Sequence, residues 1–356
     1  MIQIFISSLR ELFSGGLRNR VIGFYGFLGC FNAGAWIWAF LAFHDKPVLL
    51  GTAFLAYTFG LRHAVDADHI AAIDNVTRKL MQEGKRPLSV GLFFSLGHST
   101  IVVVASLLVY LTATVVATQL DAVKGVSGLI GTSISAFFLI AIALFNIVIL
   151  RGVWQTFQEV RKGGSYTDQS PDMLLGGGGI MARIFRSLFR IISRPWHMYP
   201  IGVLFGLGFD TATEVALLGI SAAAAAKGLS VVAMAVFPVL FMAGMTLVDT
   251  TDGILMVGAY GWAFMKPIRK LYYNLTITFV SVMVALMVGG IEAIGLLKDQ
   301  LKLTGGFWDF VGSLNDNLGT FGFVIIGVFV LSWVGSVIIY RVNGFDRFES
   351  TTTTTN

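Results

Sequence analysis

Long apolar runs, about 20 residues each and spaced along the whole chain, constrain this sequence more than any other feature. A helix of about 20 residues crosses the hydrocarbon core of a bilayer. Hydrophobic residues make up 55% of the 356 positions and charged residues 13%, against about 25% charged residues in an average soluble domain. We therefore predict an all-α, polytopic membrane protein that forms a single transmembrane domain over residues 1–356.

The runs predict eight transmembrane helices. Between the fourth and the fifth we expect a cytoplasmic loop at 151–199, with an amphipathic stretch at 180–192 on the membrane surface. The low-complexity tail, 349–356, is predicted to be disordered. The expected helix ranges are 22–43, 51–79, 89–118, 127–150, 201–226, 230–260, 271–297 and 319–341.

Positive charge indicates the orientation of these helices. Of the 25 Lys and Arg residues, 19 fall in segments on the same side as the N-terminus, five fall in segments on the other side, and Arg62 lies within a span. Because cytoplasmic loops carry the excess of Lys and Arg, both termini are predicted to be cytoplasmic, in a cell (inner) membrane. This distribution argues against a nucleic-acid partner. The single cysteine, Cys30, excludes an intramolecular disulfide and a thiolate-rich metal cluster.

The predicted second helix contains two histidines, two aspartates and an arginine within residues 62–69. Each Asp or Arg at the centre of a transmembrane helix costs about 2.5–3.5 kcal/mol, so we expect the cluster to bind something. Neutral imidazoles beside carboxylates suit a divalent transition metal; a structural polar network is the alternative. At 100° per residue, His63, Asp66 and His69 share one arc and Asp68 does not. Either the helix is broken here, or Asp68 contacts another helix.

Further ionisable residues lie in the third, fifth and sixth predicted helices. Together with Asp66, Asp68 and Asp74, they leave seven acids against one basic residue, Arg62, in the spans, at a cost on the order of 20 kcal/mol if unsatisfied. Protonation of some acids and a bound divalent cation are the two ways to lower this cost. We predict His63, Asp66 and His69 as core metal ligands. The predicted co-ligands, relays or entry sites are Asp68, His98, Asp210, Glu214, Asp249 and Asp252.

Two further polar residues have simpler expected roles. Glu292 lies near the end of the seventh helix and is predicted to be interfacial. Asn32, in the first helix, either reaches the site or forms a hydrogen bond between packed helices.

These motifs resemble those of the nickel/cobalt permease family (NiCoT), inner-membrane transporters with eight helices and cytoplasmic termini. The family signature corresponds here to residues 62–70, and three further motifs follow in order at 96–100, 207–214 and 244–252. The resemblance implies Ni²⁺ and Co²⁺ as substrates, imported at high affinity and low capacity, with no cofactor. It also implies that Asn32 and Val65 influence the metal preference.

Short identities suggest an internal repeat. Residues 59–61 and 205–207 both read Phe-Gly-Leu, 146 positions apart, and Phe94 and Gly97 pair with Phe241 and Gly244 at an offset of 147. The second and fifth helices run in opposite directions in the eight-helix scheme. We therefore expect a 3+3 inverted-topology repeat with the substrate at its interface.

The sequence contains no Walker A pattern, so either an electrochemical gradient or a partner protein is expected to drive transport. Moving two positive charges inward is worth about 4.6 kcal/mol per 100 mV. Ligation needs neutral imidazoles, so uptake should fall as the pH drops through the histidine range. Two alternatives remain: an intramembrane metalloenzyme, disfavoured by the absence of H-E-x-x-H, and a metal exporter on the same scaffold. The sequence leaves the oligomeric state open.

Overall fold

We describe the protein from a computed structural model, which describes residues 15–116, 120–161, 192–207, 212–263 and 267–342. All regular elements in these ranges are helices, as predicted. The first half contains α2 (Gly15–Phe43), α3 (Pro47–His63), α4 (Ala67–Gln82), α5 (Val90–Val116) and α6 (Leu120–Arg161). The second half contains the 3₁₀ helix η1 (Pro195–His197), α9 (Met198–Phe205), α10 (Ala212–Ala226), α11 (Val231–Met234), α12 (Val236–Ala263), α13 (Pro267–Leu301), α14 (Gly306–Asp316) and α15 (Leu318–Val342).

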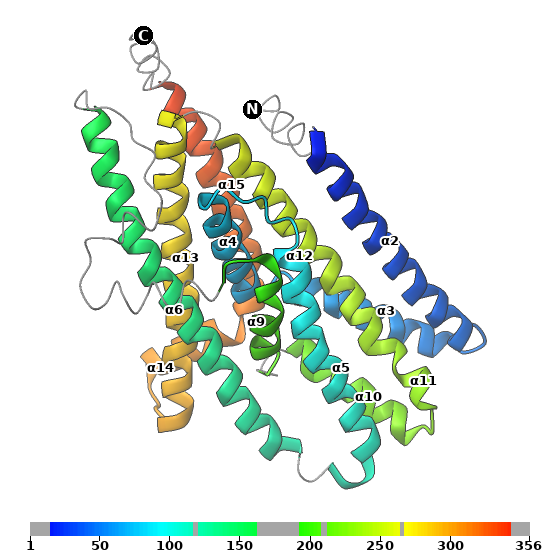
Figure 1. Cartoon of the computed structure of the whole chain (residues 1–356). Helices are drawn as coiled ribbons and strands as arrows, with labels where there is room; N and C mark the ends of the chain where they lie inside the picture. The colour runs from blue at the N-terminus through cyan, green and yellow to red at the C-terminus, as the bar shows by residue number, and fades with distance from the viewer. Residues whose placement is uncertain (1–14, 117–119, 162–191, 208–211, 264–266, 343–356) are drawn as a thin grey trace.

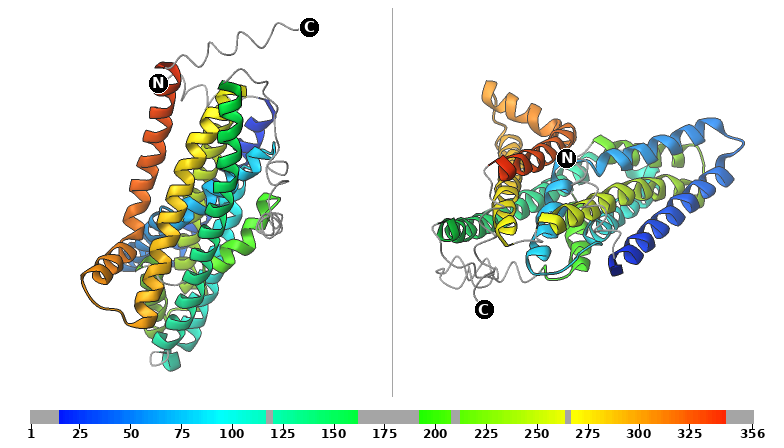
Figure 2. Two further views of the ribbon diagram at one scale, coloured as in Figure 1. Left: turned by 90° about the vertical axis from the view of Figure 1, so that its left-hand side faces the viewer. Right: turned by 90° about the horizontal axis from the view of Figure 1, so that it is seen from above.

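The helices form two groups that meet at α4. In Figure 1 and Figure 2, α6, α13 and α15 gather on one side of the bundle, and α2 and α3 lie on the other. α12 packs against α2, α3, α4 and α5, whereas α13 packs mainly along α6. α4 contacts helices of both groups, and residues 69–81 of α4 are all buried. The ionisable residues of α4 therefore lie in the centre of the protein.

The predicted second helix, 51–79, is broken in two. α3 ends at His63, α4 begins at Ala67, and their axes differ by 51°. Asp66 caps the new helix, because its side chain accepts a hydrogen bond from the amide of Ala67 at 2.8 Å. Of the two geometries considered for this segment, the structure has the break. The predicted fifth helix, 201–226, is likewise two helices, since α9 ends at Phe205 and α10 begins at Ala212.

Five described helices are long and apolar enough to cross a membrane, or up to seven if each bent pair counts as one span. The pairs are α3 with α4, and α14 with α15; α14 was not predicted. Exposed apolar side chains such as Leu41 (69%) and Leu331 (71%) indicate a lipid-facing surface. α6 continues past the predicted end at residue 150 to Arg161. The predicted amphipathic stretch up to residue 191 and the tail lie outside the described residues.

Candidate metal-binding site

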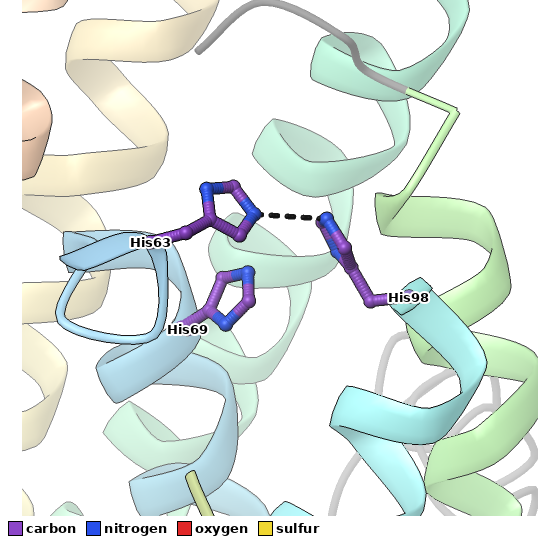
Figure 3. A group of neighbouring side chains, drawn as sticks. All are labelled: His63, His69 and His98. Atoms are coloured by element: carbon purple, nitrogen blue, oxygen red, sulfur yellow. Dashed lines mark hydrogen bonds between the residues drawn. The ribbon is translucent and has the colours of Figure 1, made fainter. Parts of the chain in front are cut away.

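Three buried imidazoles face one another around the helix break. His63 is the last residue of α3, His69 lies in the first turn of α4, and His98 lies in α5. Their ring centroids are 4.7 to 4.8 Å apart, and one ligand atom from each residue lies within 4.8 Å of the others. Figure 3 shows the rings of His63 and His98 pointing toward each other, with Nε2 atoms 2.9 Å apart. Two nitrogens bound at right angles to one ion, at about 2.1 Å each, lie about 3 Å apart.

Asp249 of α12 orients one of these imidazoles. Its carboxylate oxygens lie 3.3 and 3.5 Å from Nδ1 of His69, and both side chains are fully buried. With its proton on Nδ1, the ring donates to this carboxylate and keeps the lone pair of Nε2 available, which is the usual arrangement around a metal-bound histidine. Among the described residues, Nε2 of His69 has no hydrogen-bond partner. A buried nitrogen without a partner is costly, and a metal ion would satisfy it.

A second carboxylate approaches the imidazoles from α10. Oε1 of Glu214 lies 2.9 Å from Nε2 of His98 and 3.8 Å from Nε2 of His63. The neighbouring Thr213 hydroxyl lies 3.3 Å from Nδ1 of His63. Four helices, α3, α5, α10 and α12, and the start of α4 therefore contribute to one polar cluster.

Aromatic rings enclose this cluster. The ring of Phe94 in α5 meets the His69 ring edge to face, with ring centroids 4.8 Å apart. The ring centroids of Phe241 in α12 and His63 are 5.5 Å apart. Both phenylalanines are fully buried. Apolar walls of this kind lower the local dielectric and strengthen any electrostatic interaction inside them.

Asp66 and Asp68 act locally at the start of α4. Asp66 accepts the hydrogen bond from the Ala67 amide, and Asp68 Oδ1 accepts one from the amide of His69 at 2.8 Å. Their negative charges also interact favourably with the positive N-terminal end of the dipole of α4. Asp68 is close enough to interact electrostatically with His69 and Asp249. The structure thus groups His98 with His63 and His69, where the sequence suggested Asp66.

Asp74 belongs to a different buried network, nearer the end of α4. It accepts hydrogen bonds from the Ser281 hydroxyl, at 2.6 Å, and from the Tyr260 hydroxyl. Arg78, which is fully buried, bonds to Asn75 and to Thr278. The prediction that Arg62 is the basic residue available inside the bundle was therefore wrong, because Arg62 is exposed and Arg78 is not.

Most of the buried acids thus have hydrogen-bond partners within the protein, so the number of acids does not by itself require a bound cation. The three clustered imidazoles indicate a metal site more directly. Asp252 interacts electrostatically with Asp74 and Asp249, and its Oδ2 has no partner among the described residues. Asp210 lies outside the described residues.

Glu292 and Asn32 lie outside the imidazole cluster and contact neighbouring helices. Glu292 is buried between helices, and its Oε1 accepts a hydrogen bond from Ser135 of α6 at 3.1 Å. Asn32 links three helices, since its side-chain amide bonds to Leu28 and contacts the carbonyl of Ala243 at 3.4 Å, and Tyr57 donates to its oxygen at 3.0 Å. These contacts correspond to the helix-packing alternative for Asn32.

The chain is similar in sequence to known nickel and cobalt transport proteins. Residues 49–339 match the family described as high-affinity nickel-transport protein (NicO). A high-affinity nickel transport protein of Cupriavidus necator is 58% identical over 344 residues, which cover 97% of this chain and 98% of that protein. The nickel transporter NicT of Mycobacterium tuberculosis is 47% identical over 85% of this chain and 81% of its own length. The cobalt transport protein NhlF of Rhodococcus rhodochrous is 39% identical over 84% of this chain and 86% of its own length. No solved structure matches the chain.

Proposed function

Because the chain belongs to the family of high-affinity nickel-transport proteins, we propose that its three-imidazole cluster is the site through which it imports Ni²⁺, Co²⁺ or both. It is a metal permease and not an enzyme, and the metal ion is its transported substrate. The observation that carries the proposed site is the pairing of Nδ1 of His69 with Asp249 while Nε2 has no partner among the described residues. His63, His69 and His98 are the proposed ligands. Glu214 is the nearest carboxylate to complete the coordination, and Asp66 and Asp68 are the next candidates.

The proposed topology has eight membrane spans in the inner membrane, with both termini in the cytoplasm. The spans are α2, α3 with α4, α5, α6, α9 with α10, α11 with α12, α13, and α15. The start of α2 and the end of α15 lie at the same end of the bundle (Figure 1), which supports an even number of crossings. In this topology, α14 is an extracytoplasmic amphipathic helix at the membrane interface, because Phe307 and Phe310 are both 61% exposed.

Two glycine-mediated helix crossings support the inverted repeat. Gly60 of α3 packs against the carbonyl of Phe241 in α12, and Gly202 of α9 packs against the carbonyl of Phe94 in α5. A Cβ atom at either glycine would lie 2.0 Å from that oxygen. These crossings make Gly202 the counterpart of Gly60 in the repeat. The sequence alone suggested Gly206, which lies one helical turn later.

The reciprocal contacts at these crossings also correspond. Gly244 of α12 faces the carbonyl of Tyr57, and Gly97 of α5 faces the carbonyl of Tyr199. Each tyrosine lies three residues before the glycine of its own helix, so the same Tyr-x-x-Gly against Phe-x-x-Gly packing occurs twice. We propose that α3, α4 and α5 repeat as α9, α10 and α12. The first helix of each half differs more, since α2 packs on α12 whereas α6 packs mainly on α13.

The ends of the broken helices extend this correspondence. A glycine with positive φ lies two residues after the end of α4 and of α10, at Gly84 (76°) and Gly228 (66°). The following amides bond back to Leu80 and to Ala224, which is the Schellman arrangement at a helix C-terminus. In the proposed mechanism, two similar broken helices meet at the imidazoles, and rocking of one half against the other exposes the ion to each side in turn. The membrane potential, worth about 4.6 kcal/mol per 100 mV for two charges, drives the ion inward.

The proposal is tested by uptake of radioactive nickel into cells that express the wild-type protein or His69→Ala, with cobalt as a competitor. His69→Ala should abolish uptake at equal amounts of membrane protein, because it removes the nitrogen that Asp249 orients toward the site. His44→Ala is the matched control, since His44 is exposed in the α2–α3 connection, and it should transport normally. Normal uptake by His69→Ala would contradict the proposed site. Nickel loss from preloaded cells, without accumulation, would instead indicate the exporter alternative.

A further inference from the structure

The segment between α3 and α4 has an unusual backbone. It consists of residues 64–66, between His63 and Ala67, and the amides of Val65 and Asp66 bond back to the carbonyls of Arg62 and His63 at 3.1 and 2.9 Å. Within the described part of the chain, no backbone amide donates to the carbonyl of Val65. That carbonyl projects instead toward α15.

Gly322 of α15 receives the Val65 carbonyl. A Cβ atom at Gly322 would lie 1.5 Å from the oxygen of Val65 and 2.8 Å from its carbonyl carbon, the closest such approach among the described glycines. The backbone of Gly322 therefore lies directly against the Val65 carbonyl. A side chain at position 322 cannot be accommodated unless the broken segment or α15 moves.

α15 also holds the beginning of α4. Ile325, three residues after Gly322, is 1% exposed and belongs to the same apolar core as Ala67 and Ile70. One short stretch of α15 therefore contacts both the break that follows His63 and the helical turn that contains His69. α15 itself contributes no ionisable side chain to the imidazole cluster among the described residues.

We propose that Gly322 is a positioning residue for metal binding: it lets α15 hold the broken segment so that His63 and His69 face the same ion. This inference rests on the proposed function and extends it to a helix outside the repeat. The contact sets the separation of two ligands, so its loss should weaken metal affinity before it affects the rest of the transport cycle.

Three Gly→Ala variants separate positioning from general packing. Gly322→Ala inserts a methyl group at the break. Gly289→Ala inserts one into the tight crossing of α13 and α6, 3.0 Å from Leu139 Cβ and 3.2 Å from the carbonyl of Ala136. Gly327→Ala inserts one into open space on α15, where nothing lies within 4 Å. Nickel uptake is measured against nickel concentration and normalised to the transporter present in the membrane. The Co²⁺ absorption spectrum of each purified protein reports ligand geometry independently of transport.

Gly322→Ala should raise the apparent KM for nickel about 10-fold, the low end for changes to groups that orient metal ligands, and should alter the Co²⁺ spectrum. Gly327→Ala should match the wild type in both measurements. Gly289→Ala should leave the KM and the spectrum unchanged, whatever its effect on Tm, because its added methyl group lies at the crossing of α13 and α6 and not at the break. The proposal is overturned if Gly322→Ala leaves both the KM and the Co²⁺ spectrum unchanged.

A second variant covers the case in which Gly322→Ala does not accumulate. Ile325→Ala removes packing between α15 and α4 instead of adding an atom, so it loosens the same contact without a clash. A raised KM in Ile325→Ala supports the positioning role, and a wild-type KM contradicts it. Failure here leaves the proposed function intact, because the function depends on the His69→Ala result.

Discussion

At the scale of single residues, His69 shows how a buried polar side chain is prepared for an ion. One ring nitrogen faces Asp249 at 3.3 Å, and the other has no partner in the described part of the protein. A structural histidine in a membrane bundle would be expected to satisfy both nitrogens, because lipid supplies no hydrogen bonds. The pairing with Asp249 therefore indicates ligand chemistry more directly than the number of acids in the spans.

Substitution of Asp249 tests this role. Asp249→Asn keeps the size of the side chain but removes the charge that fixes the proton on Nδ1 of His69. The apparent KM for nickel should rise about 10- to 100-fold, as for other carboxylates behind metal-bound histidines. The measurement is nickel uptake over a range of concentrations. Asp309→Asn, at an exposed position in α14, is the control and should leave the KM unchanged; an unchanged KM in Asp249→Asn would remove the orienting role.

At the scale of elements, the break between α3 and α4 has a local cause and a consequence for the site. Asp66 starts a new helix there, because its side chain accepts a hydrogen bond from the Ala67 amide and so caps α4. The 51° bend brings His63 and His69, which lie on different helices, to one point together with His98 of α5. An uninterrupted helix would keep His63 and His69 at a fixed angular separation and could not adjust them to a third ligand.

The glycine crossings give a prediction at the same scale. Gly60→Ala and Gly202→Ala place a methyl group 2.0 Å from equivalent carbonyl oxygens, those of Phe241 and Phe94. Each variant should lose about 3 kcal/mol of stability or more, at or above the usual upper end for overpacking. Thermal unfolding of the purified proteins in detergent provides the comparison.

The matched control for these crossings is Gly219→Ala in α10, where nothing lies within 4 Å. Alanine has the higher helix propensity by about 1 kcal/mol, so this variant should be as stable as the wild type or slightly more stable. If only one of the two crossing variants were destabilised, the proposed equivalence of α3 and α9 would be in doubt.

At the scale of the whole molecule, the proposed orientation rests on the excess of Lys and Arg in the segments on the same side as the N-terminus. Lys85 follows α4, and Lys227 follows α10. In the proposed topology these two lysines are on opposite sides of the membrane. The apolar surface between them, which includes Leu41 and Leu331, then faces lipid.

Cysteine labelling can test the orientation. In a Cys30→Ser background, Lys227→Cys should react with a membrane-impermeant thiol reagent in intact cells, and Lys85→Cys should react only after the membrane is opened. Both positions are exposed, so accessibility does not depend on local packing. The reverse pattern of labelling would place the termini outside the cell and contradict the proposed orientation.

By itself the sequence determined the all-helical class, most of the helices, and the residues that are proposed to bind the metal. These follow from apolar periodicity, from loop charge and from the cost of ionisable groups in lipid, all of which are properties of short segments. The sequence also suggested a break near Asp66, since a straight helix separates Asp66 from Asp68.

Only the tertiary structure decided which residues meet. His98 lies beside His63 and His69. Asp249 pairs with the imidazole of His69. Arg78 is buried near Asp74. The contact of Gly322 with the Val65 carbonyl has no signal in the sequence at all, because both are backbone atoms of distant segments. Such contacts depend on how whole helices cross, and no local pattern of residues records the crossing.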